Sequence, residues 1–431
     1  MQPSKKILDV VESPLYAAGM ALFGLGIRVA SLRNRKARLL AAGQRETWRR
    51  LAALPSDRPV VWLHAASLGE FEQGRPIIES IRKKYPGYRV LLTFFSPSGY
   101  EVRKNYDGAD LVCYLPLDTP RNTRRFVERV KPAVAIFVKY EIWRNYLRAL
   151  GRRDIPAYLV SACFQPGQAF FKPWGKRYRD WLGMFRHIFV QDAGSRRLLE
   201  SAGFRNVTVA GDTRFDRVSA IAAEKRVIPE LEAFKEGEHH LLFMAGSSWP
   251  ADEAIYAAWL NRRPDVKAVI APHEFDAARL GRLKTLFGDD AVLLSEVRKT
   301  AAEGGDADEI CRRARVLIID CFGLLSAAYR YADIAYVGGG FGTGIHNINE
   351  AAVFGIPVLF GPEHHRFLEA EEMKTLGGGI VVENREGFER QADILYHDIV
   401  ERERRGRWAG EYIAEKCGAT PRIMQEIFPL R

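Results

Sequence analysis

Short apolar runs alternate with longer amphipathic stretches along most of this chain, and the alternation begins twice. The first series starts after residue 58. Its apolar runs have the length and the continuous apolar character of buried parallel strands, and they lie at 60–65, 89–93, 133–138, 157–161 and 187–190. Segments with helical periodicity, such as 73–84 and 122–130, separate these runs. The order predicts stacked β-α-β units.

The second series follows a charged stretch, residues 224–240, that contains Pro229 and Gly237. Its apolar runs lie at 241–245, 268–271, 316–319, 334–337 and 358–360. A chain of 431 residues is also too long for one ordinary core. We therefore expect an α/β fold of two Rossmann-like β/α/β domains facing a central cleft, the architecture called GT-B in glycosyltransferases. Two-domain dehydrogenases and periplasmic-binding-type proteins would alternate in the same way.

The predicted boundaries follow from these two series. They are an N-terminal domain at 41–223 ending in a strand near 207, a linker at 224–240, and a C-terminal domain at 241–431 that includes closing helices from 401 onward.

The first forty residues predict a membrane anchor. Residues 15–27 carry no charge, and a cluster of arginines and lysines follows them. A transmembrane helix needs roughly 20 apolar residues, and a secretory signal places its positive charge before the apolar run. We therefore expect a helix in the membrane surface, with its basic flank on anionic headgroups at the cytoplasmic face. A buried core helix is the alternative.

The composition limits the class of partner. The net charge of +11 favours anionic partners, and a charged fraction of 27% excludes a protein that is mostly embedded in the membrane. The five cysteines form no C-x-x-C pair, which indicates free thiols in a reducing compartment.

One candidate catalytic carboxylate follows the first predicted strand. Residues 62–70 read Trp-Leu-His-Ala-Ala-Ser-Leu-Gly-Glu, so that Ser67 and Gly69 precede Glu70 at the start of a helix. Ligands of open parallel sheets bind beyond the carboxyl ends of the strands, where a carboxylate can take a proton from a hydroxyl. The alternative is a glutamate that only serves the helix start. Lys139 and Glu141 follow the strand at 133–138 and would face the same cleft.

A glycine-rich segment in the second half predicts an anion site. Residues 338–350 run from a strand through Gly338, Gly340, Gly342 and Gly344 to Glu350 in a helix. Backbone N–H groups at such a turn bind phosphate, although the spacing matches neither a P-loop nor the dinucleotide fingerprint. The loops at 245–253 and 271–275 follow other strands at the same end of the sheet, as a nucleotide site requires. A purely structural glycine turn is the alternative.

We expect no metal. Asp306 and Asp308 form a D-x-D pair away from any strand end, and His364 and His365 lack a second histidine pair at metal-binding spacing.

Several of these segments together resemble the Kdo (3-deoxy-D-manno-octulosonic acid) transferase family, over nearly the whole chain. Besides the anchor, the motifs are His64-Ala-Ala-Ser-Leu-Gly-Glu70, Tyr140-Glu-Ile-Trp143, Gly211-Asp-Thr-Arg-Phe-Asp216, Gly246-Ser-Ser-Trp249, Asp320-Cys-Phe-Gly323 and the 338–350 loop. Lys139-Tyr140 and Gly342-Thr-Gly-Ile-His-Asn347 resemble a Bacteroidetes-like variant.

The resemblance implies an inverting GT-B enzyme that transfers Kdo from CMP-Kdo to a lipid A precursor, lipid IVA, in lipopolysaccharide core biosynthesis. It implies Glu70 as the general base and no metal or other cofactor. It also implies the cytoplasmic face of the inner membrane as the location, with the anionic leaflet as a partner. The expected CMP contacts are Pro272, His273, Phe322, Gly323, Leu324, Asn347, Ile348, Asn349 and Glu350. The chain departs from the family pattern at Leu324, Ile345 and Ala351.

Two other classes of function fit the same sequence features. One is another GT-B enzyme, such as a lipid-A disaccharide synthase or a sugar-nucleotide epimerase, which would bind UDP rather than CMP. The other is a basic protein without catalytic activity that binds membrane surfaces or nucleic acid. No nucleic-acid motif supports that reading.

Overall fold

The computed structural model describes residues 14–236, 239–342 and 344–429, and it divides the chain into two compact units. Unit 1 comprises residues 1–217 and 417–431, and unit 2 comprises residues 218–416. The start of the predicted anchor, two positions of the predicted linker and one position of the glycine-rich loop lie outside the described residues.

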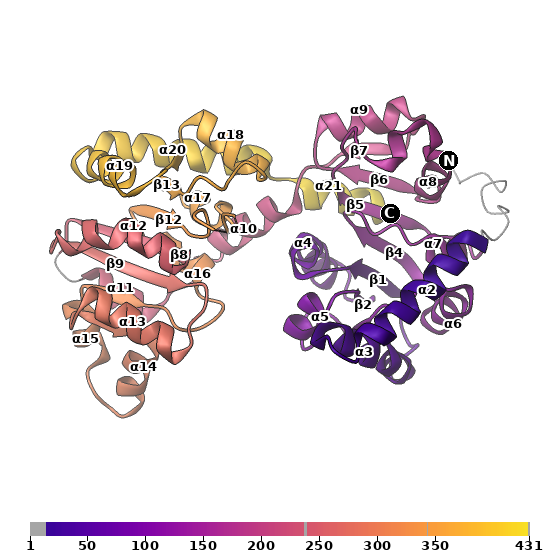
Figure 1. The fold of residues 1–431 in the computed structure, drawn as a ribbon, viewed down its shortest axis with the longest axis horizontal. Helices are drawn as coiled ribbons and strands as arrows, with labels where there is room; N and C mark the ends of the chain where they lie inside the picture. Colours follow the sequence, from indigo (N-terminus) through magenta and orange to yellow (C-terminus); the bar gives the residue numbers. More distant parts are fainter. Residues whose placement is uncertain (1–13, 237–238, 343, 430–431) are drawn as a thin grey trace. The chain divides into compact units, whose positions relative to one another are not determined.

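Unit 1 is built on a parallel sheet of seven strands in the order β3-β2-β1-β4-β5-β6-β7 (Figure 1). The strands are β1 (Val60–Ala65), β2 (Arg89–Phe94), β3 (Leu111–Tyr114), β4 (Pro132–Val138), β5 (Ala157–Ala162), β6 (His187–Val190) and β7 (Val207–Val209). The central strand β1 pairs with β2 from Val60↔Arg89 and with β4 from Val60↔Pro132. All six residues of β1 are buried, because helices cover both faces of the sheet.

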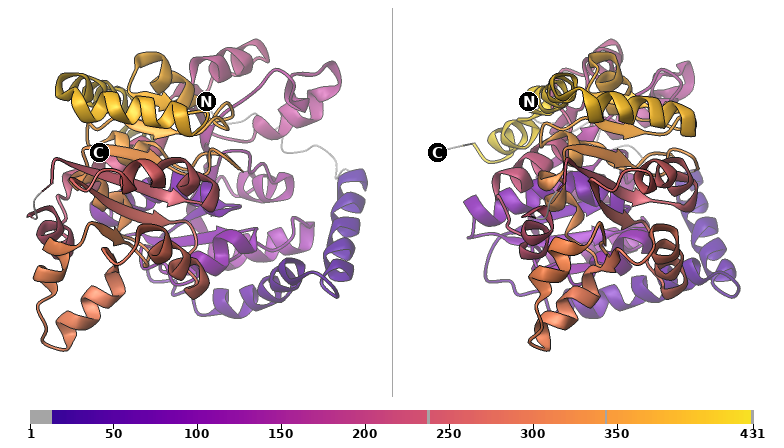
Figure 2. Two further views of the ribbon diagram at one scale, coloured as in Figure 1. Left: turned by 60° about the vertical axis from the view of Figure 1, so that its left-hand side comes forward. Right: turned by 90° about the vertical axis from the view of Figure 1, so that its left-hand side faces the viewer.

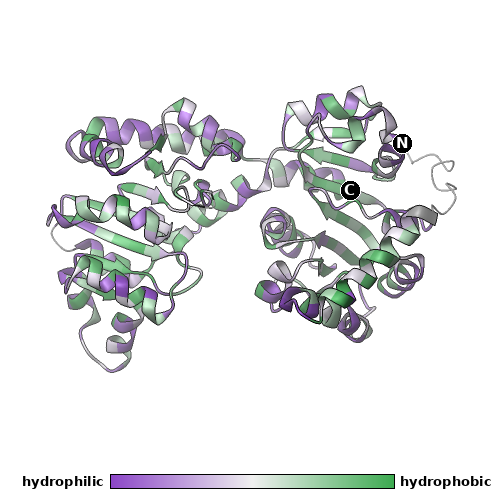
Figure 3. Ribbon diagram, in the orientation of Figure 1, coloured by the Kyte–Doolittle hydropathy of each residue, from purple (hydrophilic) through white to green (hydrophobic). Residues whose placement is uncertain are grey.

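Unit 2 repeats the pattern with a second parallel sheet of seven strands, in the order β10-β11-β9-β8-β12-β13-β14. Its strands are β8 (Leu241–Ser248), β9 (Val266–Pro272), β10 (Ala291–Leu293), β11 (Val316–Ile318), β12 (Ile334–Val337), β13 (Val358–Phe360) and β14 (Gly379–Val381). Figure 3 shows the strands of both units among the most hydrophobic segments of the chain.

Helices connect the strands in each unit. Those of unit 1 are α2 (Pro14–Ala30), α3 (Arg35–Ala52), α4 (Leu68–Lys84), α5 (Pro97–Arg103), α6 (Pro120–Val130), α7 (Arg144–Gly151), α8 (Lys176–Leu182), α9 (Ala193–Ser201) and α21 (Ala419–Ile427). Helix α10 (Thr213–Ala223) runs across the division between the units. Those of unit 2 are α11 (Pro229–Glu236), α12 (Pro250–Asn261), α13 (Ala277–Phe287), α14 (Leu294–Ala302), α15 (Ala307–Arg313), α16 (Leu325–Ala328), α17 (Asn349–Ala352), α18 (Leu368–Leu376), α19 (Arg385–His397) and α20 (Ile399–Lys416).

Helix α2 has one face on unit 1 and one face exposed. Met20 is buried, and Tyr16 donates a hydrogen bond to buried Asp118. Leu22, Leu25 and Val29 are 69%, 57% and 60% exposed. Figure 2 shows α2 and α3 following each other along the outside of unit 1. No helix among the described residues is long and apolar enough to cross a membrane.

The structure divides the chain differently from the predicted boundaries. The predicted linker contains α11, whose Leu231 and Phe234 are buried, and the whole described part of this stretch belongs to unit 2. The last predicted closing helix, α21, belongs to unit 1, because Ile423 and Met424 enter its core. Asp216 fixes the start of α21 by accepting hydrogen bonds from the backbone N–H groups of Gly418 and Thr420, both at 2.6 Å.

Candidate active site

The order of the strands in unit 1 opens a binding position between β1 and β4. The chain proceeds from β1 to β2 and β3 on one side, then returns to β4 on the other side. The loops after β1 and β4 therefore diverge, and ligands of open α/β sheets bind at such a switch point. Glu70 follows β1, and Lys139 and Glu141 follow β4.

Glu70 lies in the first turn of α4 and takes part in a capping box. Its Oε2 accepts a hydrogen bond from the backbone N–H of Ser67 at 3.1 Å, and the Ser67 hydroxyl faces the Glu70 N–H at 3.5 Å. Burial raises the pKa of Glu70, and the charge of Glu141 raises it further. The residue therefore does serve the helix start, but its half-buried carboxyl also has the raised pKa expected of a general base.

Glu141, His64 and Trp143 form a partly buried polar cluster beside Glu70. His64 Nδ1 lies 3.0 Å from the carbonyl oxygen of Thr93, and His64 Nε2 lies 3.0 Å from Glu141 Oε2. The indole N–H of Trp143 donates to the same Glu141 oxygen at 2.7 Å.

These contacts hold Glu141 in place from two sides. His64 Nδ1 also lies 2.9 Å from the Thr93 hydroxyl, which anchors the ring on the neighbouring strand β2. The Trp143 indole N–H lies 3.2 Å from His64 Nε2 in addition to its contact with Glu141.

Two residues at the ends of neighbouring strands adopt a backbone conformation that is uncommon outside glycine. Lys139, after β4, has φ of 65°, and Ser161, in β5, has φ of 53°. Such conformations cluster at functional sites. Lys139 is half-buried, and its ammonium lies 5.7 Å from the Tyr140 ring centre. Gly69 is exposed, and a Cβ there would meet nothing within 4 Å.

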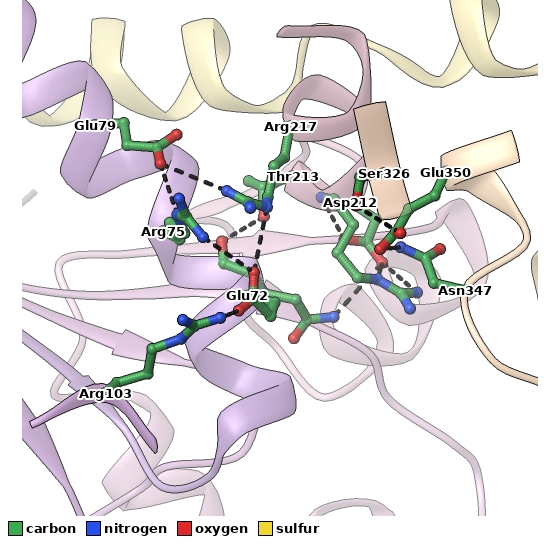
Figure 4. A network of polar contacts seen from close by, with 12 residues as sticks. Glu72, Arg75, Glu79, Arg103, Asp212, Thr213, Arg217, Ser326, Asn347 and Glu350 are labelled. Carbon is green, nitrogen blue, oxygen red and sulfur yellow. Dashed lines mark hydrogen bonds and ion pairs between the residues drawn. The ribbon is translucent and has the colours of Figure 1, made fainter. Parts of the chain in front are cut away.

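A second polar network lies along α4, α5 and α10 (Figure 4). Glu72 accepts from Arg103 at 2.9 Å and pairs with Arg217 at 3.2 Å, while Arg75 pairs with Glu79 at 2.6 Å. These contacts join α4 to its neighbours and hold the helix that carries Glu70. Sequence reasoning missed this network, because a charge on a helix gives no sign of its partner. His64 and Trp143 stand in the family motifs, but the sequence alone assigned a role to neither.

In unit 2, the predicted donor-site loops gather at the carboxyl ends of four adjacent strands. The strands β11, β9, β8 and β12 are neighbours in that order. The segments that follow them contain Phe322, His273, Trp249 and the glycine-rich loop. The switch point of this sheet lies between β8 and β12.

Three rings stack at this end of the sheet. His273 stacks on both Trp249 and His346, with ring centres 4.5 Å apart in both pairs. The Trp249 indole N–H faces His346 Nε2 at 3.3 Å. Burial and the neighbouring His273 lower the pKa of His346 to about 4, so it is neutral at pH 7 and accepts this hydrogen bond.

Glu350 lies in a hydrogen-bonded group at the end of the glycine-rich loop (Figure 4). The Ser326 hydroxyl donates to Glu350 Oε2 at 2.6 Å, and the Asn347 side-chain amide donates to Glu350 Oε1 at 3.1 Å. Asn349 is fully buried, and among the described residues neither end of its side-chain amide has a hydrogen-bond partner. Such a group is costly to bury, and a bound polar ligand or water would relieve the cost.

The remaining residues predicted to bind the donor differ in which of their groups a ligand could contact. Phe322 is 86% exposed, and its ring lies tilted against that of Phe275, with ring centres 4.6 Å apart. Leu324 and Ile348 are buried, which leaves their backbone groups for a ligand. Gly323 has φ of 85°, which explains why a glycine stands in this turn.

Pro272 ends β9, and His273 is tied to β8 by a backbone hydrogen bond to Ser248 at 3.0 Å. The glycine-rich loop is equally constrained, since a Cβ on Gly340 would lie 2.5 Å from the backbone of Gly361. The structure therefore brings the predicted donor residues of unit 2 to one edge of one sheet.

Solved structures with the same fold belong to the GT-B class. The UDP-GlcNAc 2-epimerase from Neisseria meningitidis, solved with UDP-GlcNAc, aligns with a TM-score of 0.59 at 14% identity, covering 86% of this chain and 100% of that one. MurG of Acinetobacter baumannii aligns with a TM-score of 0.54 at 12% identity, with coverages of 86% and 100%. At these identities the likeness concerns the fold alone, and it confirms the predicted GT-B class.

Sequence comparison identifies the family. The profile described as 3-deoxy-D-manno-octulosonic-acid transferase (kdotransferase) matches residues 40–217. The 3-deoxy-D-manno-octulosonic acid transferase of Bordetella pertussis is 31% identical over 346 residues, 74% of each chain. That of Haemophilus influenzae is 26% identical over 381 residues, 86% of each chain. This chain belongs to the 3-deoxy-D-manno-octulosonic acid transferase family and is a glycosyltransferase.

Proposed function

We propose that this enzyme transfers Kdo from CMP-Kdo to a lipid A precursor, lipid IVA, with inversion at the anomeric carbon, as a step of lipopolysaccharide core biosynthesis. The observation that carries the proposal is Glu70, a half-buried carboxyl with a raised pKa at the switch point of unit 1. The family membership supplies the transferred sugar.

Glu70 acts as the general base in this proposal. The attacking sugar hydroxyl is a poor nucleophile while it keeps its proton, and a carboxylate within hydrogen-bond reach removes that proton as the new bond forms. Glu141 keeps the pKa of Glu70 raised, which brings its basicity closer to the operating pH. Ser67, Gly69 and Lys139 line the approach of the acceptor.

Unit 2 binds CMP-Kdo. The unpartnered amide of Asn349 and the fixed carboxylate of Glu350 offer hydrogen bonds to the nucleotide, and the exposed ring of Phe322 offers a stacking surface. Pro272, His273 and the backbone of Gly323, Leu324 and Ile348 complete the contacts with Asn347.

The transfer needs no metal in this proposal. CMP already leaves with a phosphate, and backbone N–H groups of the glycine-rich loop can meet the charge that develops on it.

The enzyme works at the cytoplasmic face of the inner membrane. The exposed apolar face of α2 would lie in the membrane surface. A groove of about 640 Å³ between α6 and α7 supports the same orientation of the protein on the membrane. Arg121, Arg124 and Arg152 line this groove. Asn145 also lines it and donates its backbone N–H to Asp118, which Tyr16 of α2 contacts as well. An arginine-lined groove beside an apolar helix suits anionic lipid headgroups.

The choice of nucleotide tests the donor assignment. We expect CMP to raise the Tm of the protein and to bind in calorimetry at least tenfold more tightly than UMP or UDP. Tighter binding of UDP would instead indicate a UDP-sugar enzyme, in line with the donors of other GT-B proteins.

A further inference from the structure

Two adjacent histidines in unit 2 meet a carboxylate that the sequence pattern gave no reason to expect. His364 and His365 lie in the segment 361–367 that follows β13, and Glu371 lies near the start of α18. Glu371 Oε1 lies 3.0 Å from His364 Nδ1 and 2.6 Å from His365 Nδ1. The three ligand atoms all lie within 4.8 Å of one another.

An ion pair between His365 and Glu371 does not account for the whole cluster. His364 is 1% exposed, and its Nδ1 is buried without a hydrogen-bond partner among the described residues, although the Glu371 oxygen lies close by. Two imidazole nitrogens therefore converge on one carboxylate oxygen, and only one of them makes a hydrogen bond to it. Leaving the other unpaired in the interior is costly.

A metal ion among these atoms would satisfy all three. Zinc binds imidazole nitrogen and carboxylate oxygen at about 2.0–2.2 Å, so that neighbouring ligand atoms around one tetrahedral ion stand about 3.4 Å apart. The two nitrogens lie 3.0 and 2.6 Å from the carboxylate oxygen. Shifts of less than about 1 Å would therefore bring the three atoms to zinc-binding distances. Lys374, the nearby cation, lies 3.8 Å from the other oxygen, Glu371 Oε2, and leaves Oε1 facing the histidines. His365 is largely exposed, so water can complete the coordination.

We infer that His364, His365 and Glu371 bind a divalent transition-metal ion, with Zn²⁺ as the best match to two imidazoles and one carboxylate. Imidazole ligands favour Zn²⁺ over Mg²⁺, which prefers oxygen ligands. This site is separate from the transfer chemistry of Glu70 and does not depend on the proposed function.

The position of the site predicts its effect. The segment that carries the two histidines also holds the glycine-rich loop, because the Glu363 N–H donates to the Gly340 carbonyl at 3.0 Å and the Ile345 N–H donates to the Glu363 carbonyl at 3.2 Å. A bound ion would join this segment to α18 and so stabilise unit 2 around the glycine-rich loop.

The test is Zn²⁺ binding to the full-length protein after treatment with a chelator. We expect one equivalent in calorimetry, and a rise in Tm of about 5–10 °C at free Zn²⁺ near 100 times Kd. Millimolar Mg²⁺ should not compete. His365→Asn and Glu371→Gln should each weaken binding at least tenfold, and since His365 is exposed its replacement should leave the fold intact.

His397→Asn removes an exposed histidine on α19 and is the matched control, expected to bind Zn²⁺ as the wild type does. The inference is overturned if the wild type takes up no Zn²⁺. It is also overturned if His365→Asn and Glu371→Gln bind Zn²⁺ as tightly as the wild type, which would place the ion elsewhere. These readouts involve neither CMP nor transfer, so their failure is distinct from failure of the proposed function.

Discussion

The two units share one scaffold, seven parallel strands with a switch point beside the first strand, and differ in what they place at that point. In unit 1, only Ala66 and Ser67 separate β1 from α4, which puts a carboxyl in the first helical turn directly past the strand. In unit 2, residues 338–348 separate β12 from α17 and supply glycines, rings and amides instead. A short connection places one reactive group accurately, whereas a long connection can surround a ligand.

The electrostatics differ in the same sense. Unit 1 sets Glu70 beside Glu141, so that burial and like charge raise the pKa of the proposed base. Unit 2 holds Glu350 between the hydroxyl of Ser326 and the amide of Asn347, which keeps its carboxylate in one orientation as an acceptor. We therefore propose that unit 1 carries out proton transfer and unit 2 recognises the donor, and each of the following changes probes that division.

The largest expected effect is on turnover in unit 1. Glu70→Gln keeps the size and the capping contact of the side chain and removes its basicity, so we expect transfer to fall by at least about a hundredfold. CMP affinity and Tm should stay at the wild-type values. Steady-state kinetics, calorimetry and thermal unfolding measure the three quantities.

Glu70→Ala serves as the control for the capping contact. It should lose activity to the same extent and also lose about 0.5–2 kcal/mol in the free energy of unfolding. If Glu70→Gln keeps its activity per folded molecule, Glu70 serves only the start of α4.

The next effect concerns membrane binding, which we expect to depend on unit 1 and not on unit 2. Replacing Leu22, Leu25 and Val29 by Ser removes exposed apolar groups without touching the packed face of α2. We expect a loss of about 3 kcal/mol, or about a hundredfold in partitioning to anionic vesicles, measured by sedimentation. Replacing Leu368 and Val400, exposed residues of unit 2, should change nothing. Undiminished sedimentation of the triple variant would exclude α2 as the anchor.

A smaller effect is expected for donor recognition in unit 2. Glu350→Ala should weaken CMP binding about ten- to a hundredfold, since a charge-assisted hydrogen bond is worth roughly 1.5–3 kcal/mol. Glu383→Ala, an exposed carboxylate of the same unit, should leave calorimetric affinity unchanged. Equal affinity in both variants would remove Glu350 from the site.

The smallest effect is on pH dependence. A base with a raised pKa loses its charge as the pH falls, so the acid limb of kcat/KM should lie above the usual glutamate pKa of about 4.3. Glu141→Gln removes the like charge that raises the pKa of Glu70, and the limb should move to lower pH. An acid limb at an unchanged or higher pH would show that Glu141 does not raise the pKa of Glu70.

The strands that were predicted are those with continuous apolar runs. β1, β6, β12 and β13 match their predicted bounds, and other predicted strands differ at their ends. Three strands, β3, β10 and β14, were not predicted. Each is a short strand at the edge of its sheet and is only partly buried, so its apolar run is less distinct than that of an equally short inner strand. The division between units was placed too late because a charged stretch resembles a linker, although α11 buries one apolar face.

The sequence could predict those candidate site residues that directly follow a strand. Glu70, Lys139 and Glu141 were proposed because they follow apolar runs, and the structure places them just past β1 and β4. The donor loops were proposed from the motifs. The cluster of His64 and Glu141 depends on a contact with Thr93 of β2, distant in sequence, and no local pattern reveals it. Glu371 was likewise missed because its histidine partners lie on the preceding loop.

The most direct test of the account is the product itself. Purified protein incubated with CMP-Kdo and the tetraacylated lipid A precursor should yield, by mass spectrometry, a lipid heavier by one or more Kdo residues, with release of CMP. The account predicts this product from the wild type and almost none from Glu70→Gln at equal CMP binding. Absence of Kdo addition by the wild type, or undiminished addition by Glu70→Gln, would contradict it.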